Sequence, residues 1–161
     1  MSFGTKRILI GMGVGVVMFA AYLIFALGAK APASDDVRAW ALAMLIFIGI
    51  AVVVIIVVEI LFHIVYSIAV AIKQRNQSDE KVERIISVTI AEDERDKQIY
   101  LKAARIGYRV SGVGILLVLV AFAIGISMLF ALHLVLAAFF LGCFAEGVAS
   151  IFYHEKGIQH A

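Results

Sequence analysis

Apolar residues along the chain gather into four long runs that are separated by polar stretches. The runs cover about residues 8–27, 39–72, 110–130 and 132–153. About 20 apolar helical residues cross a hydrocarbon core of about 30 Å, so each run predicts a transmembrane helix. The second run would reach about 50 Å, so it must tilt or extend out of the membrane. We therefore predict an all-α membrane protein with four transmembrane helices in a single domain, residues 1–161.

The composition agrees with a membrane protein. Of the 161 residues, 63% are hydrophobic and 16% are charged, which is more apolar than a soluble domain of this size. The first run could pass for a signal peptide, but it continues to Gly28 without a convincing cleavage site, so we interpret it as a retained membrane helix. A net charge of +2 gives no indication of nucleic-acid binding, and the single cysteine, Cys143, excludes an internal disulfide.

Lysine and arginine residues concentrate near both termini and between the second and third runs, whereas their charge in the loop of residues 29–38 is balanced by acids. The positive-inside rule then predicts a multi-pass membrane protein with both termini and the segment between the second and third runs in the cytoplasm. The cytoplasmic connector of residues 74–109 is also predicted to be helical, because acidic residues precede basic ones in it, as suits a helix dipole.

The charged connector has two interpretations. It is either a solvated helix beside the lipid headgroups or, through residues 79–105, a docking surface for a cytoplasmic protein partner. The docking candidates are Asp93, Glu94, Arg95 and Asp96.

A short internal similarity suggests a duplication. A Gly-Val-Gly sequence occurs at residues 13–15 and again at residues 112–114. A second pattern, Glu followed by Ile and Tyr five and seven residues later, occurs at Glu59, Ile64, Tyr66 and at Glu146, Ile151, Tyr153. We interpret the four helices as two related hairpins with a pseudo-two-fold axis along the membrane normal.

Polar residues form one stripe on the second run and one on the fourth, at helical spacing. The first stripe consists of Glu59, His63 and Tyr66, and the second of Cys143, Glu146, Ser150 and Tyr153. A charged carboxylate that faces lipid is costly, so both stripes should face the bundle interior or an oligomer interface.

Three interpretations of the stripes remain open. The carboxyl groups can be structural and hydrogen-bond between helices. They can form a proton or cation path with Glu59, His63 and Glu146 as the binding groups, because two close carboxyls at low dielectric cannot both be ionised and can exchange a proton for a cation. A metal site that adds Cys143 is the third, although no dense ligand motif supports it. We expect neither a metal nor a cofactor.

No catalytic motif is recognisable, so we do not expect an enzyme. We favour a small proton- or cation-coupled transporter or channel that uses the paired intramembrane carboxylates. The alternative is a non-enzymatic membrane interaction protein, such as a sensor, regulator or accessory subunit, whose polar cluster is structural. Besides membrane lipids, the expected partner is a second copy of the chain, because Gly11 and Gly15 form a small-xxx-small pair that permits a homodimer.

The stretch DERDKQIYLKAARIGYRV and the ending YHEKG resemble an uncharacterised family of small bacterial integral membrane proteins. The matching positions are Asp93, Glu94, Arg95, Asp96, Lys102, Ala103 and Tyr108. The resemblance covers about residues 90–157 and implies a four-helix bundle without an established activity. That family more often has two arginines before the final glycine, and the His154-Glu155-Lys156 sequence departs from this pattern.

Overall fold

The chain is all-helical. A computed structural model describes the backbone of residues 3–74 and 79–156 and, within these ranges, the side chains of residues 4–65, 68 and 94–156. This part of the chain forms four helices and no strand: α1 (Phe3–Leu27), α2 (Val37–Gln74), α3 (Asp79–Ala123) and α4 (Met128–Lys156). Each helix contains a segment long and apolar enough to cross a membrane. The predicted all-α fold with four such helices is confirmed.

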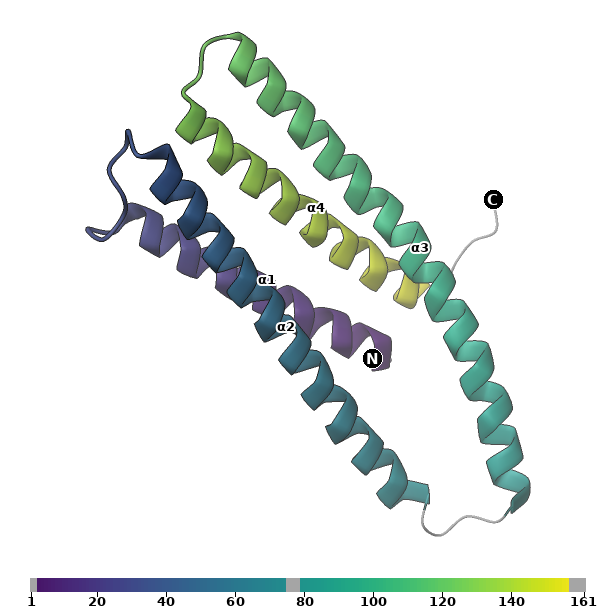
Figure 1. Ribbon diagram of the computed structural model, residues 1–161. Helices are drawn as coiled ribbons and strands as arrows, with labels where there is room; N and C mark the ends of the chain where they lie inside the picture. Colours follow the sequence, from purple (N-terminus) through teal and green to yellow (C-terminus); the bar gives the residue numbers. More distant parts are fainter. Residues whose placement is uncertain (1–2, 75–78, 157–161) are drawn as a thin grey trace.

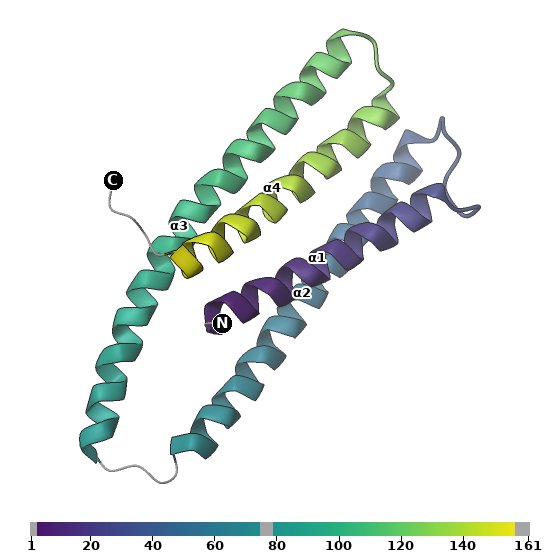
Figure 2. The same cartoon turned by 180° about the vertical axis from the view of Figure 1, so that it is seen from behind.

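The second and third helices, α2 and α3, are much longer than a bilayer is thick. They contain 38 and 45 residues, or about 57 and 68 Å at 1.5 Å per residue. Both extend beyond α1 and α4 at the same end of the molecule (Figures 1 and 2). The predicted helical connector is therefore no separate element, because α3 continues from Asp79 directly into its apolar segment, Glu94–Ala123.

The turn between α3 and α4 lies earlier than the apolar pattern indicates. We expected the third and fourth runs to meet near residue 131, but α3 ends at Ala123 and α4 begins at Met128. Gly125 has a φ of 86°, and Ile126 donates a backbone hydrogen bond to Ala121, which is a glycine-dependent helix end. Ser127 then accepts a hydrogen bond from the amide of Phe130 at 3.4 Å. The apolar pattern does not reveal this turn because the residues of the turn are themselves largely apolar.

The turn between α1 and α2 is fixed by a cap and an indole. Asp36 Oδ1 accepts a hydrogen bond from the amide of Ala39 at 2.9 Å, which caps the start of α2. Trp40 Nε1 donates to the carbonyl of Ala33 at 3.1 Å. The buried Trp40 ring also meets the His133 ring of α4, with centroids 4.9 Å apart. Aromatic packing thus joins the two hairpins at this end of the bundle.

The helices pack in the order α2, α1, α4, α3, and α2 holds no extended contact with α3. The closest seam lies between α3 and α4, where small residues allow the backbones to approach. A Cβ on Gly107 would lie 2.9 Å from the carbonyl oxygen of Gly142, and a Cβ on Gly114 would overlap Ala138. The central pair touches where Met12 of α1 packs on Gly147 of α4.

Most apolar side chains have no protein neighbour to cover them. Leu45, Ile24 and Leu27 are 64%, 74% and 89% exposed, and many similar residues line the outward faces of all four helices. A soluble monomer rarely exposes such large apolar surfaces, whereas a hydrocarbon environment accepts them without cost. Together with the four spanning-length helices, this surface identifies a multi-pass membrane protein architecture.

Candidate functional site

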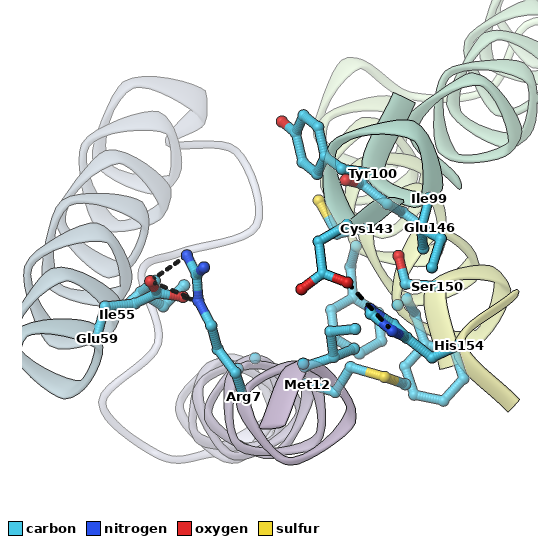
Figure 3. A pocket seen from close by; sticks show the side chains of 18 residues that line it. Arg7, Met12, Ile55, Glu59, Ile99, Tyr100, Cys143, Glu146, Ser150 and His154 are labelled. Atoms are coloured by element: carbon cyan, nitrogen blue, oxygen red, sulfur yellow. Dashed lines mark hydrogen bonds and ion pairs between the residues drawn. The ribbon is translucent and has the colours of Figure 1, made fainter. Parts of the chain in front are cut away.

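A cavity of about 410 Å³ lies among the four helices, and its lining includes the start of α1 and the end of α4 (Figure 3). It exists because α2 and α3 stay apart while α1 and α4 are in contact between them. Its lining from α1 and α2 is Gly4, Arg7, Ile8, Gly11, Met12, Gly15, Ile55 and Glu59. Its lining from α3 and α4 is Asp96, Ile99, Tyr100, Phe140, Cys143, Phe144, Glu146, Gly147, Ser150 and His154.

The first polar group of the cavity is an ion pair between α1 and α2. Arg7 Nε donates to both carboxylate oxygens of Glu59, at 3.1 and 3.0 Å, and Nη2 donates to Oε2 at 2.5 Å. Figure 3 shows the Arg7 side chain reaching across from α1 to Glu59. A carboxylate inside an apolar helix is costly unless it is paired, and Arg7 supplies the pairing cation within the same hairpin.

The second polar group is Glu146, on the opposite side of the cavity. It is half-buried, and its Oε2 lies 3.2 Å from the position of a Cβ on Gly107. The missing side chain of Gly107 therefore makes room for this carboxyl group against α3. Across the part of the chain with described side chains, no cation lies within ion-pair distance of Glu146.

The third polar group joins the start of the apolar segment of α3 to the end of α4. His154 Nδ1 lies 3.7 Å from Asp96 Oδ1, and Arg95 Nη2 donates to the carbonyl oxygen of His154 at 3.4 Å. The His154 side chain is only 8% exposed, because its imidazole ring packs against Gly4 of α1. These contacts bring the start of α1 and the end of α4 to the same end of the molecule.

Glu59 and Glu146 line the same cavity, but no hydrogen bond joins them. Each turns toward the first helix of its own hairpin, Glu59 to Arg7 and Glu146 to Gly107. This resemblance in placement agrees with two related hairpins. The order of the helices is less symmetric, because α1 packs against both α2 and α4 whereas α3 packs mainly against α4.

Only some of the remaining residues of the two stripes line the cavity. Cys143 and Ser150 line the cavity. His63 is not among the lining residues, and it lies with Glu59 in a shallow apolar groove formed by residues of α2. Tyr153 contacts the Phe152 ring on its own helix, with centroids 6.0 Å apart. The side chain of Tyr66 lies outside the described residues.

The docking candidates differ in whether they contact other residues of the chain. Arg95 and Asp96 engage His154, so both have partners inside the chain. Glu94 is exposed. The side chain of Asp93 lies outside the described residues.

Arg7, Asp96 and His154 are three polar cavity residues that the stripe pattern missed. Arg7 lies outside both stripes, near the start of the first apolar run, and His154 lies one residue after the end of the second stripe. A usable signal for Arg7 was present, because it stands at the start of an apolar helix whose hairpin partner carries an acid in its own apolar segment. No sequence spacing links His154 to Asp96, which lies 58 residues earlier on another helix.

The described side chains do not form the cluster of ligands that the metal-site interpretation requires. Among the described side chains, no three from His, Cys, Asp and Glu converge so that they could hold a metal ion. The cavity instead combines one arginine and three carboxyl groups with aliphatic and aromatic walls.

Comparison with protein-family models, with curated proteins and with solved structures found no match to this chain.

Proposed function

We propose that the protein is a small non-enzymatic membrane transporter or channel in which a proton or cation binds at Glu146, beside the Arg7–Glu59 ion pair. The observation that supports this proposal is the single cavity that contains both carboxyl groups and draws on all four helices. Structural hydrogen bonds alone would need no empty volume beside the acids. An accessible space next to intramembrane carboxyls is typical of substrate and ion pathways.

The two acids have different roles in this proposal. Glu59 is already matched by Arg7, so the pair holds α1 and α2 together at the cavity wall. Glu146 has no such counter-ion among the described residues, so it is the group that takes up a proton or a cation. A carboxyl that must be neutralised in a low-dielectric site can exchange one for the other, which couples proton movement to cation movement.

We further propose that the protein lies in the bacterial inner membrane with both termini in the cytoplasm. The contact between Gly4 and His154 places the start of α1 and the end of α4 at one end of the bundle, in keeping with this topology. The basic residues near the termini and between α2 and α3 favour the cytoplasmic side for that end. We also propose that the chain is a member of the uncharacterised bacterial family that shares the DERD motif.

Cation flux in proteoliposomes tests the transport function. Purified protein is reconstituted, a pH gradient is imposed, and internal pH is followed while different cations are added outside. We expect proton movement that depends on an added cation and that is lost in Glu146→Gln. Glu155→Gln, an exposed acid on α4 that does not line the cavity, is the matched control and should keep wild-type flux.

The alternative function is a membrane interaction protein, and the length of α3 favours it. Residues 79–93 of α3 precede its apolar segment and extend the helix beyond the bundle. A helix of this kind can dock a cytoplasmic partner through residues 79–105. Under this alternative, Glu146→Gln folds normally and the wild-type protein gives no cation-dependent proton movement with any cation tested.

A further inference from the structure

We propose that the cavity binds a hydrophobic organic cation, meaning an amine or ammonium group attached to an apolar body. This substrate class rests on the transport function proposed above and makes it more specific. Three properties of the cavity carry the inference: its size, its walls and its unbalanced charge.

The size and walls fit a small organic molecule. A volume of about 410 Å³ falls in the range of about 300–1,000 Å³ that is usual for small-molecule sites. The walls are largely apolar, with Ile8 and Met12 from α1, Ile55 from α2 and Phe144 from α4. A bare metal ion would require several converging ligands, and none converge among the described side chains. Such walls favour a ligand with an apolar body.

The charge of the cavity selects the sign of the ligand. Arg7 is the one arginine among the described lining residues, and Glu59 holds its guanidinium in a bidentate pair. Asp96 faces His154 at 3.7 Å. Glu146 has neither an arginine nor a histidine partner in the described part of the chain. No cation among the described side chains therefore balances the Glu146 carboxylate, and an incoming ammonium group supplies the missing positive charge.

Aromatic side chains strengthen this selection. Phe144 and Tyr100 line the cavity and are 39% and 61% exposed, so ring surface is available to a ligand. The face of an aromatic ring attracts organic cations, and quaternary ammonium groups are commonly recognised in this way. An anion would find Arg7 already paired, and a neutral molecule would leave Glu146 without a counter-ion.

The single cysteine allows a test on the unmodified chain. Cys143 lines the cavity, is exposed and is the one thiol in the sequence, so its alkylation by N-ethylmaleimide reports whether the cavity is occupied. The probe is benzyltrimethylammonium. Its neutral isostere neopentylbenzene and the anion phenylacetate are the controls. We expect the cation to slow alkylation at least about tenfold at saturation and the two controls to leave the rate nearly unchanged. Equal protection by all three compounds, or none by the cation, overturns the proposal.

A matched pair of variants tests the role of Glu146. In the same alkylation assay, Glu146→Gln should weaken protection by benzyltrimethylammonium about tenfold or more, whereas Glu155→Gln should protect like the wild type. Gel filtration and a thermal melt in detergent verify that both variants fold. Unchanged protection in folded Glu146→Gln contradicts the assignment of Glu146 as the counter-ion.

The results separate this inference from the transport function. Protection of Cys143 without cation-dependent flux supports the binding site and refutes transport. Flux with sodium or potassium, but no protection by benzyltrimethylammonium, supports transport and overturns the organic-cation site.

Discussion

Arg7 and Glu59 form a bidentate ion pair between two helices of an apolar bundle, with nitrogen–oxygen distances of 2.5 to 3.1 Å. The pair links α1 to α2, and α2 otherwise packs little against the rest of the bundle. Glu59 is therefore a paired carboxylate, whereas Glu146 has no ion-pair partner among the described side chains. This difference between two acids at similar positions of two hairpins shapes the function proposed here.

The Arg7–Glu59 pair should couple the two helices energetically. In a double-mutant cycle with Arg7→Gln and Glu59→Gln, we expect a coupling of about 0.5–1 kcal/mol, because both side chains are more than one-third exposed and solvent or headgroups screen them. Thermal or denaturant unfolding in detergent at low salt measures it. The coupling should shrink in high salt. A cycle in which the two changes add independently at low salt would contradict the pairing.

A side chain at Gly107 should destabilise the packing between α3 and α4. In Gly107→Ala the new Cβ would lie 2.9 Å from a backbone oxygen of α4, so the helices must separate. We expect a loss of about 1–3 kcal/mol in the free energy of unfolding. Gly112→Ala on the same helix is the control, because a Cβ there meets nothing within 4 Å and alanine favours a helix. If both variants unfold at the same denaturant concentration, the close packing is wrong.

The helix end at Gly125 should depend on the absence of a side chain. Its φ of 86° is one that other residues adopt at a cost, so Gly125→Ala should destabilise the protein by about 1 kcal/mol. The measurement is again unfolding in detergent. Gly112→Ala serves as the helical comparison, and a Gly125→Ala variant as stable as the wild type would argue for a different turn.

Topology can be checked with reporter fusions. Fusions after Gly157 and at Asn76 should report the cytoplasm, and a fusion at Ser34 should report the periplasm, because the basic residues lie near the first two positions. A periplasmic signal from the Asn76 fusion is the result that would reject this orientation.

We also predict a homodimer. Gly11 and Gly15 line the cavity, and a Cβ on either would meet no atom of the described residues within 4 Å, so a second copy can contact them only across the cavity opening. Native mass spectrometry in mild detergent should detect dimers, and Gly15→Leu should reduce them more than Gly112→Leu does. Monomers alone at every protein concentration would count against the prediction.

The sequence by itself determined the four membrane helices, because run length against bilayer thickness is a local property that needs no tertiary contact. It also indicated that Glu59 and Glu146 matter, since an acid in an apolar run is costly wherever the run packs. It misplaced the turn at Gly125 because the flanking Ile124 and Ile126 continue the apolar run and hide the break.

Tertiary structure decided which groups these acids meet. Rotation of α1 against α2 brings Arg7 to Glu59, 52 residues away, whereas His63 on the next turn of α2 is not among the cavity-lining residues. The close approach of α3 and α4 at Gly107 and Gly142 sets the surroundings of Glu146. Helical periodicity tells which residues share a face, but not which neighbour that face meets. That choice depends on the packing of all four helices together.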